Sequence, residues 1–161
     1  MSFWQFSRGD ETLRAEPGVG DHRLTASDIV EVTGDACVHV FGDAKRLWAF
    51  GRSTVHVHGE FEEIFVLGHS NVHIYRKCGK VDVGMDGTAW VEEGAAGTLV
   101  VVDSHGTVHG GNGIKVRAYG ESRVHAPGTA DVVLNWFAQW HTGSEVRGDL
   151  SLYRPGYCVI R

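Results

Sequence analysis

A repeat of about 17 residues is the feature that most constrains what this chain can fold into. Glycines stand at positions 34, 42, 51, 59 and 68, at alternating intervals of eight and nine residues. Apolar residues keep the same period in four columns: Val30, Leu47, Ile64 and Val81; Val32, Ala49, Val66 and Val83; Val38, Val55 and Val72; Val40, Val57 and Ile74. A fixed period held in several columns at once is the mark of a repeat architecture.

Within each half of the repeat, apolar residues alternate with polar ones, as in Val55-His56-Val57-His58. A period of two, with β-branched residues on the inward side, predicts strands. A helical solenoid needs longer repeats and a period of 3.6, and a hexapeptide β-helix repeats every six residues. We therefore predict an all-β fold, a β-solenoid with about 17 residues per coil, two short strands in each coil, and glycine-containing corners.

The repeat becomes less regular after Gly84. We expect Met85-Asp86-Gly87-Thr88 and Gly94-Ala95-Ala96-Gly97 to be corners with an extra residue, and Gly110-Gly111-Asn112-Gly113 to be a wide loop. Counting one full repeat onward aligns Leu99 and Val101 with Val116 and Ala118. The predicted solenoid spans residues 25–135, and segments 1–24 and 136–161 are predicted to be end caps or arms. These two segments are rich in aromatic residues: Phe3, Trp4, Phe6, Trp136, Phe137, Trp140, Tyr153 and Tyr157.

If the apolar columns face inward, their neighbours face outward and form two unusual rows. One outer row contains imidazole and aromatic rings: His39, Phe41, His56, His58, His73, Tyr75 and Trp90. The other is apolar, with charged Arg46, Glu63 and Asp82 beside it: Trp48, Phe50, Phe65 and Leu67. Contiguous exposed apolar surface is typical of an interface, where aromatic residues are enriched. A purely structural interpretation, in which the rings stabilise stacked strands as cross-strand pairs, stays open.

The recurrence of His39, His56 and His73 raises the question of a metal site, because imidazole binds zinc and iron. A column on one sheet holds its ligands in a line, however, whereas a closed tetrahedral site needs ligands that converge on a point. No cysteine or carboxylate completes a set in that column. We expect no metal and no other cofactor.

Catalysis and charged partners are also disfavoured. Acidic residues stand at predicted corners or in adjacent pairs such as Glu62-Glu63, whose members point to opposite faces of a strand, so no groove of clustered carboxylates is expected. The net charge of −5 argues against nucleic acid and anionic membranes as partners. No long apolar run and no signal-peptide pattern is visible. The three cysteines, Cys37, Cys78 and Cys158, fit neither a metal motif nor a disulfide framework.

Several half-coils share a pattern of small residue, ring, glycine, polar residue and small residue, with Pro127 in the ring position of the last: Val40-Phe41-Gly42-Asp43-Ala44, Ala49-Phe50-Gly51-Arg52-Ser53, Ala118-Tyr119-Gly120-Glu121-Ser122 and Ala126-Pro127-Gly128-Thr129-Ala130. Over residues 25–135 this resembles the A-Y-G-S-A-T-V repeats of phage-type β-helical proteins. It is less similar to the bactofilins, whose repeats lack the histidine and aromatic columns. The first resemblance implies a structural β-helix on a virion, as a capsid decoration or tail component, and transfers no functional residue.

Together these observations predict a non-enzymatic structural or binding module. Its outward rows are expected to dock copies of the chain itself or a capsid or tail lattice, on a virion if phage-encoded and in the cytoplasm otherwise. The main alternative is a β-helix that binds or cleaves carbohydrate, with His56, His58, Tyr75 and Trp90 as a stacking platform for glycans. A third possibility is end-to-end polymerisation through the caps.

Overall fold

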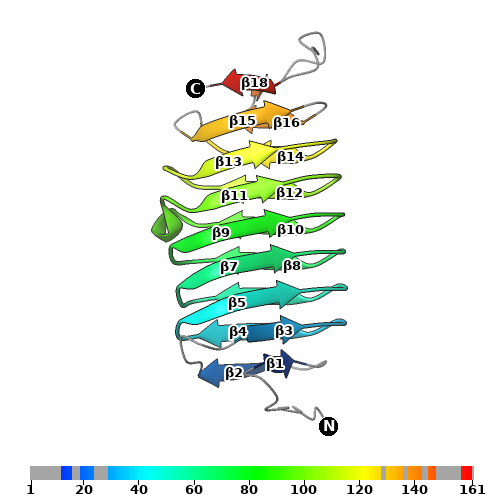
Figure 1. The fold of residues 1–161 in the computed structure, drawn as a ribbon, viewed down its shortest axis with the longest axis vertical. Coiled ribbons are helices and arrows are strands. Elements are labelled where there is room, and N and C mark those ends of the chain that lie inside the picture. The colour runs from blue at the N-terminus through cyan, green and yellow to red at the C-terminus, as the bar shows by residue number, and fades with distance from the viewer. Residues whose placement is uncertain are drawn as a thin grey trace.

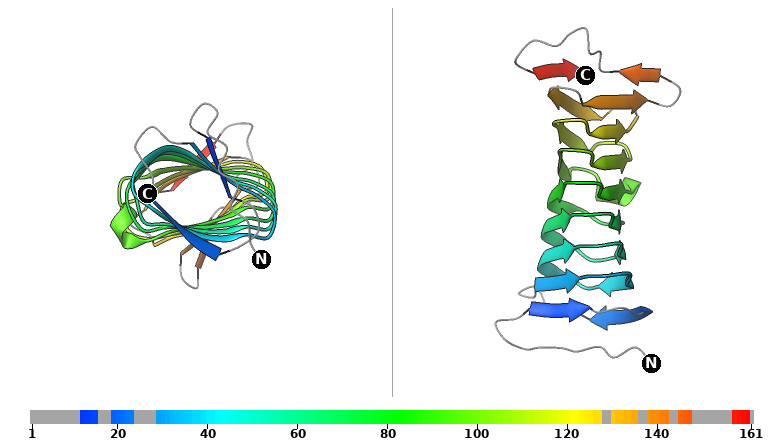
Figure 2. Two further views of the ribbon diagram at one scale, coloured as in Figure 1. Left: turned by 90° about the horizontal axis from the view of Figure 1, so that it is seen from below. Right: turned by 90° about the vertical axis from the view of Figure 1, so that its right-hand side faces the viewer.

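The structure is a computed structural model, and it describes residues 12–15, 19–23, 29–127, 130–135, 138–142, 145–147 and 157–160. These residues form a β-solenoid in which two parallel sheets face each other (Figure 1). Six coils lie in the continuous segment 29–127. Viewed along the rod, the coils superpose as a flattened tube (Figure 2). The predicted all-β solenoid is confirmed, together with its repeat length.

Each coil gives one strand to each sheet. Sheet A contains β1 (Thr12–Ala15), β3 (Ile29–Val32), β5 (Ala44–Ala49), β7 (Phe61–Val66), β9 (Cys78–Val83), β11 (Leu99–Val102), β13 (Lys115–Ala118), β15 (Asp131–Asn135) and β18 (Tyr157–Ile160). Sheet B contains β2 (Val19–Arg23), β4 (Cys37–Phe41), β6 (Thr54–Val57), β8 (Asn71–Ile74), β10 (Thr88–Val91), β12 (Thr107–Gly110), β14 (Arg123–His125), β16 (Gln139–Thr142) and β17 (Glu145–Arg147). Pairing is parallel except at the C-terminal end, where β18 lies antiparallel to β15 and β17 antiparallel to β16.

The predicted inward columns form the core. Leu47 lies between Val30 and Ile64 in sheet A, and all three are buried. In sheet B, Val55 lies between Val38 and Val72, and all three have no exposed surface. Because each column places a β-branched or other apolar side chain above a similar one, the tube fills by repetition of a single packing unit.

The two corners of the coil differ in how strictly they repeat. The corner from sheet A to sheet B, here called the constant corner, has a fixed length: Val30 to Val38, Leu47 to Val55 and Val100 to Val108 are each eight positions apart. Its aligned turn residues all have positive φ, between 54° and 73°: Gly34, Gly51, Gly68, Met85, Ser104 and Gly120. A side chain at Gly51 would meet the Gly34 carbonyl oxygen at 3.0 Å, so the close approach favours glycine there in addition to the positive φ.

The corner from sheet B back to sheet A, here called the variable corner, changes length along the rod. The step from Val55 to Ile64 is nine positions, that from Ala89 to Val100 is eleven, and that from Val108 to Val116 is eight. The longest of these steps contains a single 3₁₀ turn, η1 (Glu93–Ala95).

These lengths correct two predictions for the irregular segment. The corner at Met85 contains no extra residue, and the corner at Gly94 contains two. Val100 and Val102, not Leu99 and Val101, are the buried partners of Val116 and Ala118, one position short of the predicted repeat. The error arose because Leu99–Val102 is apolar throughout, so alternation within the strand does not reveal which residues face inward.

The prediction of a wide loop at Gly110–Gly113 is wrong, because Gly110 ends β12 and the step from Val108 to Val116 is the shortest form of the variable corner. Gly110 continues the buried column above Val91, and a Cβ on Gly110 would overlap Cδ1 of Ile114. Ile114 is 1% exposed and fills the space that a side chain at 110 would otherwise occupy. The missing side chain and the inward-turned isoleucine are therefore complementary.

Both sheets extend beyond the central repeat. Strands β1 and β2 lie in the segment predicted to be an N-terminal cap or arm and pair in parallel with β3 and β4. Strands β16, β17 and β18 lie in the predicted C-terminal cap or arm. The side chains of the aromatic residues noted in both segments lie outside the described part of the structure.

Candidate functional site

Six rings form one continuous stack on the outer face of sheet B. This first ring column consists of His39, His56, His73, Trp90, His109 and His125. Neighbouring ring centroids are 4.5, 4.7, 5.7, 3.7 and 4.6 Å apart in that order, and neighbouring planes are tilted by 4–16°. Parallel strands hold equivalent side chains one strand spacing apart, which is close to the distance at which flat rings stack.

The first four of these rings were predicted to face outward, as the structure shows, whereas His109 and His125 were missed. Those two depart from the fixed period because the variable corner first lengthens and then shortens. A local signal was present: the dipeptide Val-His occurs at 38, 55, 57, 72, 108 and 124, and all but the one at 57 stand at the same place in five strands of sheet B. Alignment by this dipeptide, instead of by a fixed period, finds all five histidines.

A second, shorter stack runs beside the first. This second ring column consists of Phe41, His58 and Tyr75, with centroids 4.6 and 4.8 Å apart. The two columns are linked sideways, since His39 Nδ1 lies 3.1 Å from His58 Nε2 and His56 Nδ1 lies 3.1 Å from the Tyr75 hydroxyl. In the His39–His58 bond one ring nitrogen must donate and the other accept, so the bond is lost if both rings are protonated.

Burial opposes protonation in the first ring column. Burial lowers the pKa of His56, and the neighbouring His73, His39 and His58 lower it further. Burial also lowers the pKa of His73, against a smaller opposing effect of Glu92. For His109, burial and then the adjacent His125 lower the pKa to about 4. These three imidazoles are therefore neutral near pH 7, and each has one acceptor nitrogen.

Stacking determines which part of each ring is available for contact. Because the planes follow one another along the rod, the ring faces cover each other and the ring edges point away from the sheet. Phe41 and Trp90 are 41% and 37% exposed, and the other rings of both columns are half-buried. The surface thus offers hydrocarbon edges and imidazole nitrogens in regular rows.

The outer face of sheet A has an apolar surface on β5 and β7. This Trp48 patch consists of Trp48, Phe50, Phe65 and Leu67, all half-buried on the outer side, as predicted. Trp48 stacks on Phe65 with centroids 4.0 Å apart, and on Phe50 at 5.7 Å. A column of alternating charge lies beside it, with Arg46 Nε 2.7 Å from Glu63 Oε2 and Lys80 Nζ 2.8 Å from Asp82 Oδ2.

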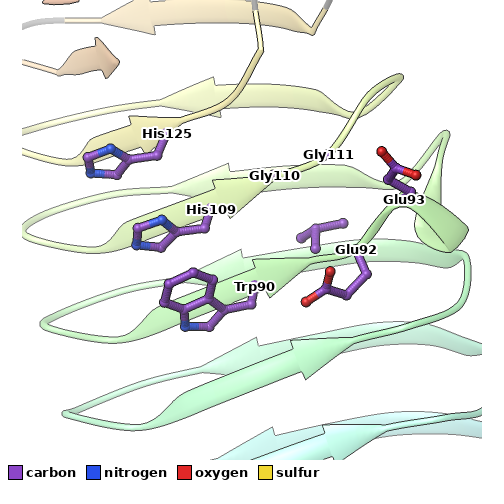
Figure 3. Close-up of a pocket in the computed structure, with 8 residues that line it drawn as sticks. Trp90, Glu92, Glu93, His109, Gly110, Gly111 and His125 are labelled. Carbon is purple, nitrogen blue, oxygen red and sulfur yellow. The ribbon is translucent and has the colours of Figure 1, made fainter. Parts of the chain in front are cut away.

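A pocket of about 300 Å³ opens on sheet B, at the C-terminal part of the first ring column (Figure 3). Its lining contains three ring residues, two glycines, two carboxylates and one core residue: Trp90, His109, His125, Gly110, Gly111, Glu92, Glu93 and Val91. In the close-up, the three rings lie in line on one side, and Glu92 and Glu93 extend on the other. The pocket could not be found from the sequence, because it depends on the length of one corner.

The described residues contain no assembled metal site, and the buried thiol of Cys78 is not activated. Nowhere among them do three His, Cys, Asp or Glu side chains converge as metal ligands. Burial raises the pKa of Cys78 to about 12, and a thiol of this kind is inert as a nucleophile. No helix in this part of the chain is long and apolar enough to cross a bilayer.

Comparisons with known proteins found no matching family model, no matching curated protein and no matching solved structure. The structure is therefore assigned as a β-solenoid of about six coils, and no family is assigned.

Proposed function

We propose that this protein is a non-enzymatic docking module: a rigid β-solenoid whose outer aromatic surfaces bind further copies of the same chain. The observation that supports this most directly is the Trp48 patch, in which two large rings stack on the outer face of a sheet whose inner face is already filled. A preformed rod loses little conformational entropy when it docks, so that even a modest apolar patch contributes usefully to affinity.

Charge favours a second copy as the partner. The column beside the patch alternates in sign through Arg46, Glu63 and Lys80, and an alternating column is complementary to a shifted or inverted copy of itself. A closed homodimer needs a self-complementary patch of this kind. A capsid or tail lattice, the partner implied by the resemblance to phage-type repeats, is the second candidate and would meet the same patch.

The carbohydrate alternative has weaker support. Sugars stack on open aromatic faces, but both faces of His56 and Trp90 are covered by their neighbours in the first ring column, and one face of Tyr75 is covered by His58. Only ring edges and nitrogens are presented outward. A glycan would therefore have to bind mainly through hydrogen bonds to ring nitrogens, with little stacking.

The test is the oligomeric state of a patch variant. We expect the wild-type chain to form dimers or larger oligomers across a dilution series in light scattering, and the double variant Trp48→Ser/Phe65→Ser to be monomeric with unchanged β-sheet circular dichroism. The matched control is Met85→Ser, which removes a 61% exposed apolar side chain outside the patch and should leave assembly intact. A wild-type chain that stays monomeric throughout would contradict self-docking, and a folded double variant that still assembles would exclude the patch. Glycan binding by either chain would support the alternative.

A further inference from the structure

The pocket on sheet B is a vacant position in the second ring column. The residues that follow the paired positions Ile74, Val91 and Gly110 in successive coils are Tyr75, Glu92 and Gly111. The backbone bonds Glu92 N to Ile74 O (2.9 Å) and Gly111 N to Val91 O (2.8 Å) keep these residues in register. The last ring of the second ring column is therefore Tyr75. The next coil has a carboxylate, Glu92, at this position, and the coil after it has Gly111, which has no side chain.

The lining has an excess of hydrogen-bond acceptors and negative charge. It includes Glu92 and Glu93 and no lysine or arginine. Neither carboxylate forms an ion pair with any residue in the part of the chain that the structure describes. Facing them, His109 is neutral at pH 7 and therefore has an acceptor nitrogen. A ligand that fits this lining must bring donors and positive charge.

We propose that this pocket binds a guanidinium group, which takes the position left without a side chain at Gly111, beside His109, and pairs with the carboxylates of Glu92 and Glu93. The group is flat, as a position in this column requires, because successive rings of the second ring column have their centroids only 4.6 and 4.8 Å apart. Its N–H donors fan out in one plane and form paired hydrogen bonds with a carboxylate.

Two other groups of similar size fit less well. An ammonium group carries the same charge, but it is compact, strongly hydrated and not planar, so it cannot use the flat vacancy. A urea group has the flat shape without the charge, so the two carboxylates would remain uncompensated. The proposal therefore predicts discrimination by both shape and charge. It does not depend on docking through the Trp48 patch, which lies on the opposite sheet.

The experiment is an NMR titration of the full chain with N-acetyl-L-arginine amide, observing the indole N–H signal that is lost in Trp90→Phe. We expect a saturable shift with a dissociation constant in the millimolar range, since the carboxylates are exposed to solvent. The citrulline analogue, of the same shape but uncharged, should bind at least about fivefold more weakly, and the lysine analogue at least about threefold more weakly. These comparisons use the wild-type protein and do not depend on the folding of a variant.

The double variant Glu92→Gln/Glu93→Gln should weaken arginine binding at least about fivefold. Its control is Glu62→Gln, which removes an exposed carboxylate on sheet A and should leave binding unchanged. The absence of a saturable shift, equal binding of the citrulline analogue, or an unchanged affinity in the double variant would each overturn the proposal. A second probe, guanidinium chloride, distinguishes whether the guanidinium group belongs to a protein or to a free small molecule. Binding of the capped arginine at least as tight as that of guanidinium chloride supports a protein-borne arginine, whereas tighter binding of guanidinium alone supports a free small guanidino compound.

Discussion

Both corners of each coil turn the chain from one sheet to the other, but they differ in how strictly their length repeats. The constant corner repeats both length and backbone conformation in every coil between Val30 and Val124, including positive φ at Met85 and Ser104, where the residue is not glycine. The variable corner takes nine, eleven or eight positions in the same part of the rod. Irregularity of the chain is thus confined to one edge of the tube.

This contrast shows what a solenoid needs in order to keep its columns aligned. Strand pairing sets the register of each sheet independently, so a corner can lengthen if its extra residues project outward, as the 3₁₀ turn η1 does. At the constant corner, backbone bonds run from coil to coil through the turn itself, for example from Arg52 N to Gly34 O at 2.9 Å. An extra residue there would interrupt this ladder.

The largest difference in the free energy of unfolding is expected between one insertion at the constant corner and the same insertion at the variable corner. A Gly-Ser pair inserted between Gly51 and Arg52 should lower the free energy of unfolding by at least about 3 kcal/mol, because it interrupts the bonds donated by Phe50, Arg52 and Thr54. The same pair inserted between Ala96 and Gly97, in η1's already extended corner, should cost less, about 1–2 kcal/mol, because it interrupts mainly the turn bond from Thr98 N to Ala95 O. Urea denaturation measures both, and equal losses would show that the corners do not differ in tolerance.

The next effect concerns the shortened form of the variable corner. Ile114→Ala should cost about 2–4 kcal/mol, because it leaves a cavity in the core, and Gly110→Ala about 1–3 kcal/mol through overlap with Ile114. Combined, the two should cost at least about 1 kcal/mol less than their sum, since each relieves the defect of the other. Urea denaturation of the single and double variants measures this coupling. Val57→Ala, in a distant coil, should add to Ile114→Ala without coupling, and an additive Gly110–Ile114 pair would refute the complementary packing.

A smaller effect is expected on the pH dependence of stability. It comes from His109, which lies in the first ring column just after the eleven-residue step. His109 has a folded pKa of about 4, below the ordinary value of 6.5, so the unfolded chain binds a proton more readily between these pH values. The contribution of His109 to the free energy of unfolding is therefore fully present above about pH 6.5 and is lost as the pH falls toward 4. After a discount for partial exposure, we expect a loss of about 1–2 kcal/mol.

A phenylalanine at position 109 tests this contribution, because it keeps an aromatic ring in the first ring column and removes the titrating imidazole. His109→Phe should show a smaller drop in melting temperature between pH 7.5 and pH 4.5 than the wild type, by about 2–6 °C. The control is His69→Gln, which removes an imidazole that is 71% exposed and 3.7 Å from Asp86 and should leave the wild-type drop nearly unchanged. An identical pH dependence in His109→Phe would mean that its burial is not linked to stability.

The smallest effect tests strain at the constant corner. Met85 and Ser104 adopt φ of 56° and 54°, a conformation that is unfavourable for residues with a Cβ. Met85→Gly should therefore stabilise the protein by up to about 1 kcal/mol in urea denaturation, after the greater entropy loss of glycine is included. In the same column, Gly120→Ala should destabilise, because its Cβ would lie 3.0 Å from Ser104 N. A destabilised Met85→Gly would show that the side chain contributes more than the strain costs.

What could be predicted from the sequence follows the same division between corners. The columns through Leu47, Ile64 and Val81 could be predicted because strict alternation and a fixed period occur together there. The positions of Val100 and Val102 could not, because an uninterrupted apolar strand follows a corner of unknown length. The outward placement of Trp48 and His56 was predictable from alternation, whereas the pocket depends on Gly111 reaching a particular level of the stack. Whether the Trp48 patch docks a partner stays a prediction.

The equal length and common register of successive coils before Gly84 have a consequence for engineering. Each of these coils meets its neighbours through the same pairs, so that residues 46–62 form a closed unit whose two ends are equivalent. Duplicating that segment in tandem would raise the height of the molecule by one strand spacing, about 4.8 Å, and leave both ends untouched. The number of repeated coils therefore sets the length of the rod.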